Sequence, residues 1–499
     1  MSSEMHNLSS LSITRGRYID DGKHDDDGQL KRTGMQTLSC SSSCKFPFVL
    51  TVFVLHVGTW QHASAHIITT VIGSGVLSLS WCFAQMGWIP GVSTLLFFCV
   101  ISLFTSILLT DSYRSPDPVF GTRNSTYMNA VKATLGMQQY KLCGIAQMGV
   151  LVGITIGYTT TTAISMAAIY KSICFHQHGH HADCHVSNNP LMIIFAIIEI
   201  ILSQVPNFHE LSPLSVIAAI MSFMYSTTGI VLSIAKIAGN GVGKTSLTGI
   251  PIGNNGLTAM EKMWRVLSAI GDIAFAFSFS FVLIEIQDTL KSSPPENKSM
   301  KKAATVGIFV CSMFYMMCGV LGYAAFGNDA PGNFLTGFGF FDPFWLVALA
   351  NLCVVIHLLG AYQIIAQPIF GFMEEWARKR WPENRVIRKH YTMGSLEFSL
   401  FRLIGRTTYV VVMTIIAMLF PFFNDFVGLI GACTFWPLSV YFPIQMYIAQ
   451  FNIPRLSCAW ICLQLITVAC FIVSLVAAIG STRGLVKSVT TFKPFQSVS

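Results

Sequence analysis

Charged side chains are scarce in this sequence. Asp, Glu, Lys and Arg make up 11% of its 499 residues, whereas hydrophobic residues make up 53%. Because soluble domains carry about 25% charged residues, most of this chain must face lipid or the interior of a helix bundle. The formal charge of +8 is scattered between apolar segments and forms no surface for reading nucleic acid, so no nucleic-acid partner is expected.

Motifs of soluble enzymes are also missing. The sequence contains neither HExxH nor GxSxG. The stretch GNGVGKTS resembles a phosphate-binding loop, but the position five residues before its Gly-Lys pair is Ala238 instead of glycine, and no strand precedes it. We therefore expect that the protein is not an enzyme and that it carries no cofactor.

The sequence predicts an all-α membrane protein with about eleven transmembrane helices, each of which needs roughly 20 mostly apolar residues. Residues 1–34 are polar and are expected to form a disordered cytoplasmic tail without a signal peptide. The predicted spans lie near residues 63–83, 88–110, 143–170, 190–205, 212–236, 266–286, 303–325, 343–371, 404–421, 424–449 and 458–480.

Loop charge predicts the orientation. The loops after the sixth and eighth spans are rich in Lys and Arg, whereas the loop between the seventh and eighth spans has neither. The positive-inside rule then places the N-terminus in the cytoplasm and, after eleven spans, the C-terminus outside. The loop after the fifth span disagrees, because it is predicted to be external and yet holds basic residues.

Gly73-Ser74-Gly75 interrupts the first apolar segment half-way along its length. A loosened backbone survives at membrane depth only where it lines a cavity within the protein. Many secondary transporters bind a carboxylate at a broken first helix of this kind. The motif therefore predicts a carrier.

Ionisable residues within the predicted spans are candidates for function, since they are costly in a bilayer. We consider Asp272, His66 and His357 as proton-coupling residues, because a buried carboxylate can take up a proton and histidine titrates near neutral pH. For each residue the alternative is a structural group held by hydrogen bonds.

Cys174 and Cys184 flank a loop that is rich in histidine, CFHQHGHHADCH. His and Cys at such spacing can bind zinc. The loop is predicted to be extracellular, however, where the two cysteines would oxidise to a disulfide and cease to be metal ligands. We therefore favour a disulfide and no metal site.

Several segments resemble plant amino acid permeases of the amino acid/auxin permease family. They include ASAHIITTVIGSGVLSLSW at 63–81, QVPNFHELSPLS at 204–215 and GDIAFAFSFSFVLIEIQDTLKSSPPENK at 271–298. The resemblance runs almost without gaps from Thr59 to the C-terminus. It implies a five-plus-five inverted-repeat fold of the amino acid–polyamine–organocation type with an eleventh helix, which agrees with the count of spans.

The resemblance also implies a proton-coupled symporter that imports amino acids across the plasma membrane, with amino acid, proton and lipid bilayer as partners. The substrate carboxylate would bind amides around Gly73, Ser74, Gly75 and Val76. Carbonyls of the sixth span would accept the α-amino group, at Ala274, Phe275, Ala276, Phe277 and Ser278. The alternatives are a transporter-like amino acid sensor and a uniporter without proton coupling.

Residues 35–58 are atypical. Members of the family run directly from a Lys-Arg-Thr-Gly stretch into a pair like Thr59-Trp60, so these residues form an insertion at one point. Its end is rich in Phe, Val and Leu, as a translated pyrimidine tract would be. We hypothesise a retained intron or an error in the gene model, which leaves residues 59–499 as the transporter domain.

Overall fold

A computed structural model of the chain describes residues 58–491, except for 180, 205–211, 254–255, 340–342, 385–386, 388–389, 394–395 and 421. The expected tail at 1–34 and nearly all of the expected insertion at 35–58 lie outside the described residues.

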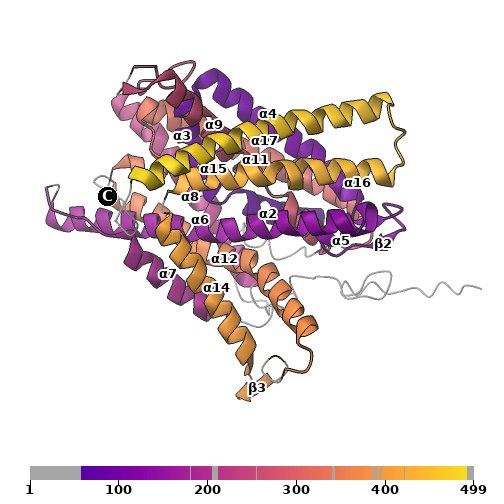
Figure 1. Cartoon of the computed structure of the whole chain (residues 1–499). Coiled ribbons are helices and arrows are strands. Elements are labelled where there is room, and N and C mark those ends of the chain that lie inside the picture. Colours follow the sequence, from indigo (N-terminus) through magenta and orange to yellow (C-terminus); the bar gives the residue numbers. More distant parts are fainter. Residues whose placement is uncertain are drawn as a thin grey trace, which may run out of the picture.

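Helices account for all the predicted spans (Figure 1). The first five spans are α2 (Trp60–Val71) with η1 (Ser74–Ser78) and α3 (Leu79–Met86), α4 (Trp88–Asp111), α6 (Met137–His178), α7 (Asn188–Ser203) and α8 (Ser212–Asn240). The other six are α9 (Ala259–Ala276) with η4 (Ser280–Val282) and α10 (Leu283–Gln287), α11 (Glu296–Phe326), α12 (Phe344–Arg380), α14 (Leu400–Leu419), α15 (Phe423–Thr434) with the π-helical η7 (Phe435–Tyr441) and α16 (Phe442–Gln450), and α17 (Cys458–Thr491).

Shorter elements connect these spans. The helix α5 (Tyr127–Leu135) precedes α6, and η5 (Gly327–Asp329) and η6 (Phe334–Phe338) follow α11. Two antiparallel hairpins are formed by β1 (Arg114–Ser115) with β2 (Thr122–Arg123) and by β3 (His390–Met393) with β4 (Leu396–Ser399). The second hairpin joins α12 to α14, away from the centre of the bundle (Figure 1).

The lengths of the helices fit a polytopic membrane protein. Within the described residues, nine helices are long and apolar enough to cross a bilayer, and the bent pair of α2 with α3 makes a tenth. The remaining predicted span is α7, whose 16 residues reach only about 24 Å. It is short, as the sequence predicts.

The helices pack in two groups. Spans one, two, six and seven adjoin one another, because α11 contacts α2, α3 and α4, and α3 contacts α9. Spans three, four, eight and nine form the other group through contacts of α6 with α7, α12 and α14. The tenth and eleventh spans, α15 and α17, lie together against α9 (Figure 1).

Two spans are interrupted, and they are the first and the sixth. The axis bends by 48° between α2 and the segment formed by η1 and α3, and α9 ends before η4 and α10 resume the sixth span. Successive spans alternate in direction, so helices five apart cross the membrane in opposite senses. This is the relation that a five-plus-five inverted repeat requires.

Candidate functional site

The first break is centred on Gly73. α2 ends at Val71, and Gly73 adopts φ −120° and ψ −144° before η1 begins at Ser74. Two glycines within three residues weaken the helix here, since each costs about 1 kcal/mol relative to alanine. The first amides of the new helical segment lack intrahelical partners and carry the positive end of its dipole.

The second break contains no glycine. α9 ends at Ala276, and Phe277 to Phe279 separate it from η4. The sequence AFAFSFSF alternates with period two instead of the helical period. Serine hydroxyls also compete for backbone carbonyls, because Ser278 Oγ donates to the Ala274 carbonyl at 2.7 Å.

The position of the second break refines the predicted site for the α-amino group. Of the residues expected around the second break, Ala274, Phe275 and Ala276 form the end of helix α9, and only Phe277 and Ser278 lie in the break itself. The last carbonyls of α9 still carry the negative end of its dipole. They remain a predicted site for an α-amino group.

The two breaks touch each other. A Cβ on Gly75 of η1 would stand 3.1 Å from both Cα and Cβ of Ala276 and 3.4 Å from Cδ1 of Phe275. The start of one half-helix therefore meets the end of another, and opposite helix dipole ends face a common point. Such a point suits a zwitterion, which carries one negative and one positive group.

Tyrosine hydroxyls pair with the carbonyls that the breaks release. Tyr225 Oη of α8 donates to the Gly73 carbonyl at 2.9 Å. Tyr315 Oη of α11 lies within hydrogen-bond distance of the carbonyls of Val71 and Ala276, the second at 3.0 Å, so its one hydrogen is shared between the two breaks. The sequence reasoning missed both tyrosines, because a tyrosine in an apolar span gives no signal of its partner.

His357 of α12 and Tyr158 of α6 face the first break. A Cβ on Gly73 would stand 3.8 Å from His357 Nε2 and 3.6 Å from Tyr158 Oη. His357 Nδ1 lies 2.8 Å from the Ala218 carbonyl, so Nδ1 carries the hydrogen and the neutral ring leaves Nε2 as an acceptor. Nε2 is buried and has no hydrogen-bond partner among the described residues.

Asp272 lies one turn of α9 before Ala276, and its side chain is fully buried. Its Oδ2 is 3.8 Å from Cys82 Sγ of α3, a contact in which the thiol donates. Its Oδ1 has no hydrogen-bond partner in the described part of the chain. A carboxylate in such surroundings is a candidate for taking up a proton.

His66 lies apart from this group. It is seven residues before Gly73 in α2, about 10 Å along the helix axis. Its ring contacts the ring of His62 edge-on, with centroids 4.5 Å apart. Of the three predicted proton-coupling residues, the structure places Asp272 and His357 beside the breaks and His66 about two turns away.

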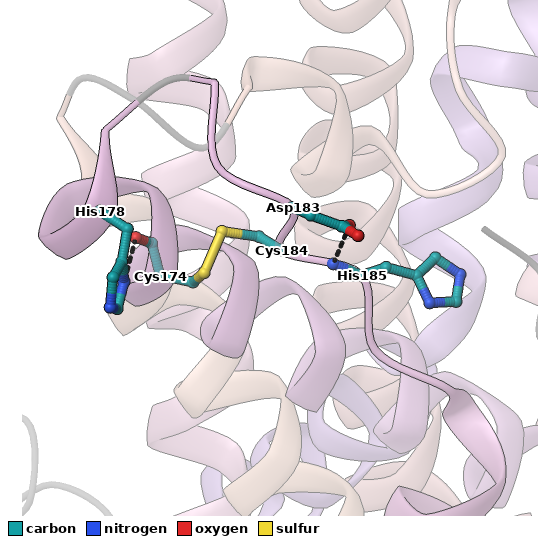
Figure 2. The surroundings of a disulfide bond; sticks show 5 residues. All are labelled: Cys174, His178, Asp183, Cys184 and His185. Carbon is teal, nitrogen blue, oxygen red and sulfur yellow. Dashed lines mark hydrogen bonds between the residues drawn. A yellow bond between two sulfur atoms is a disulfide. The ribbon is translucent and has the colours of Figure 1, made fainter.

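Cys174 at the end of α6 and Cys184 in the following loop are joined by a disulfide (Figure 2). The nearby imidazole rings do not converge: those of His178 and His185 lie on opposite sides of the disulfide (Figure 2), and the ring of His176 stacks on Phe344. Among the described residues, which lack His180, no three His, Cys, Asp or Glu side chains group as metal ligands.

A membrane bundle whose first and sixth helices are broken and meet in its interior is the architecture of many secondary transporters. The solved structure of MhsT in complex with L-phenylalanine shares this fold. It aligns with a TM-score of 0.54 over 84% of this chain and 98% of MhsT, at 12% sequence identity. The expected helical transporter fold is confirmed.

Sequence comparison identifies the family. Residues 56–487 match the model of transmembrane amino acid transporter proteins. Amino acid permeases 6 and 1 of Arabidopsis thaliana are 58% and 57% identical to the chain, covering 88% of it and 93% and 92% of their own lengths. Amino acid permease 2 of the same plant is 50% identical over 95% of this chain and 92% of its own length. The chain belongs to the transmembrane amino acid transporter family, which confirms the resemblance to plant amino acid permeases.

Proposed function

We propose that this protein is a proton-coupled symporter that imports amino acids across the plasma membrane. Its family and its relatives named amino acid permeases support an amino acid as the substrate. Orientation rests on charge: Lys298, Lys301 and Lys302 at the start of α11 belong on the cytoplasmic side. The N-terminus is then cytoplasmic and the C-terminus extracellular.

The contact between the two breaks supports this choice of substrate. The α-carboxylate binds the amides of Ser74, Gly75 and Val76, at the positive end of η1 and α3. The α-amino group binds carbonyls at the end of α9, such as that of Ala276. The Ala276 carbonyl accepts one hydroxyl, from Tyr315, and has a second lone pair to offer, whereas the Phe277 carbonyl already accepts from Ser102 Oγ and from the Phe279 amide.

The main support for proton coupling is the buried carboxylate of Asp272. It makes no ion pair with any described residue, and one of its oxygens has no hydrogen-bond partner. An ionised carboxylate in this position is costly unless it takes up a proton or a cation. Because Asp272 is one turn from the contact between Gly75 and Ala276, its charge acts directly on the substrate site.

Protonation of Asp272 would affect the first break through two contacts. Cys82 lies on α3, the half-helix that follows the break, and its thiol contacts Asp272 Oδ2. Ser78 Oγ, at the junction of η1 and α3, donates to the Gly75 carbonyl at 3.1 Å. Neutralising Asp272 therefore changes the interaction between α3 and α9. The proton and the amino acid then both bind one conformation more tightly than the other, and this difference in affinity drives alternating access.

Replacing Asp272 by asparagine tests this function. We expect the inward current evoked by external amino acids to fall more than tenfold and the remaining uptake to lose its dependence on external pH, because the side chain no longer titrates. Glu199→Gln is the matched control. Glu199 is equally buried, and its Oε1 also has no hydrogen-bond partner among the described residues, but it lies in α7, where Gln363 Nε2 donates to its Oε2 at 2.5 Å.

Simultaneous recording of labelled uptake and current at several external pH values separates the alternatives. Uptake without inward current in the unmodified protein would identify a uniporter. Binding of amino acids without uptake would identify a sensor. Either result overturns symport, and a normal pH profile in Asp272→Asn would remove Asp272 from the coupling mechanism.

A further inference from the structure

Three helices enclose the carboxylate of Asp272. α9 carries it, and α15 and α17 pack against α9 at this level. A Cβ on Gly428 of α15 would stand 2.6 Å from Asp272 Oδ1 and 3.0 Å from Ser481 Oγ of α17. The carboxylate oxygen and the hydroxyl therefore converge on the space that glycine leaves at position 428.

The polar atoms in this space are unpaired. Asp272 Oδ1 and Ser481 Oγ are each buried and have no hydrogen-bond partner within the described residues. Asp272 and Ser481 are both 0% exposed. Buried polar groups are nearly always paired with protein or with ordered water, so two unpaired atoms beside one glycine require an explanation.

A second carboxylate lies one turn away in a similar setting. Asp425 is three residues before Gly428 in α15 and therefore lies on the same helix face. A Cβ on Gly484 of α17 would collide with Asp425 Oδ1, and Ser488 Oγ of α17 donates to Asp425 Oδ2 at 2.7 Å. The two carboxylates are close enough to interact electrostatically.

The small residues of α17 connect these two positions. Ser481, Gly484 and Ser488 are spaced by three and four residues, so they form one stripe along the helix. Ser481 faces the space beside Asp272, and the other two contact Asp425. The eleventh helix thus places a hydroxyl group beside each carboxylate, Ser481 beside Asp272 and Ser488 beside Asp425.

This stripe leads to one end of the bundle. Asp425 is in the first turn of α15, and Ser488 is in the last turn of α17. α9 also begins at this end, where half-buried Glu261 pairs with exposed Arg265 at 3.2 Å. Asp425 is half-buried, so water reaches it more readily than it reaches Asp272. Loop charge predicts that this end faces outward.

The titratable and charged groups that face the two carboxylates are few. Asp272 faces the thiol of Cys82 from α3 and Asp425 from α15. Asp425 is within electrostatic range of Arg265 of α9, and α17 presents Ser488 to it. A proton is the ion that two adjacent carboxylates and a hydroxyl transfer most simply.

We propose that Asp425 and Ser481 form a proton relay that loads Asp272 from the end of the bundle where α17 ends. The proposal rests on the proposed symport function. Asp425 takes a proton from water at that end and passes it to the Ser481 hydroxyl, which releases its own proton to Asp272 Oδ1. Each step breaks one O–H bond and forms another, and it leaves Asp425 ionised and Asp272 neutral.

The test uses the full-length chain in oocytes, with an equimolar mixture of the proteinogenic L-amino acids as the probe. Ser481→Ala removes the hydroxyl, Ser481→Thr keeps it, and Asp425→Asn removes the outer carboxylate. Ser474→Ala is the matched control, because Ser474 is buried two turns earlier on the same face of α17. Currents are recorded against external pH and divided by the amount of protein at the cell surface.

We expect Ser481→Ala and Asp425→Asn to lower the apparent affinity for external protons by about tenfold, which is about one pH unit, because Asp272 then loses its route to water at that end. The half-maximal pH then moves to more acidic values, while Ser481→Thr and Ser474→Ala keep the normal profile. Normal profiles in both Ser481→Ala and Asp425→Asn would overturn the relay and leave symport standing. An unmodified protein whose current requires Na⁺, or that gives no current, would overturn both.

Discussion

Replacing Gly75 by alanine puts one methyl group between the two helix breaks. Its carbon would lie 3.1 Å from Cα and Cβ of Ala276, whereas carbon atoms pack at about 3.5–4.0 Å. The start of η1 and the end of α9 must therefore move apart by about 0.5 Å. The neighbouring atoms belong to a helix backbone and a short side chain, so they cannot rotate away.

Overpacking of this kind costs about 1–3 kcal/mol, which corresponds to a factor of about 5 to 150 against any state in which the breaks are in contact. If that contact forms the substrate site, uptake per molecule at the cell surface falls at least fivefold. The assay is the initial rate of labelled amino acid uptake, divided by the surface amount measured by biotinylation.

Two variants serve as comparisons. Gly149→Ala changes a glycine of α6 whose Cβ position has nothing within 4 Å, so transport should be normal. Gly73→Ala fits sterically, with its nearest neighbour, Tyr158 Oη, at 3.6 Å, but it crowds the space before His357. We expect a raised KM with Vmax retained. Unimpaired uptake by Gly75→Ala would refute the assignment of this contact to the substrate site.

Three further predictions follow from other features. Tyr315→Phe removes the hydroxyl that bridges the two breaks and should reduce uptake at least fivefold, because it leaves the buried Ala276 carbonyl unpaired at a cost of about 1–3 kcal/mol; a normal rate at normal surface density would contradict the bridge. Replacing Cys174 and Cys184 together by serine should lower surface abundance but leave uptake per surface molecule unchanged, whereas a raised KM would place this loop in the substrate path. Amplification of the mature transcript should yield a main product without the codons for 35–58, and a main product that contains them would reject the retained intron.

The sequence itself indicated only the first of the two breaks. At the first break, glycine at positions 73 and 75 weakens the helix directly. No glycine marks the second break, and the range implied by the family resemblance began three residues before the actual break at Phe277. Ser278 Oγ takes the Ala274 carbonyl that the Ser278 amide would bond in a continuing helix, so α9 ends after Ala276.

The sequence by itself determined the number of spans, the family and the position of the first break, since each depends on local composition or on a contiguous motif. Only the tertiary structure decided which polar groups meet. Tyr225 reaches Gly73 across 152 residues of chain, and Gly428 makes room for a carboxylate carried by another helix. Helical periodicity shows which residues share a face, but the partner of that face depends on the packing of helices distant in sequence.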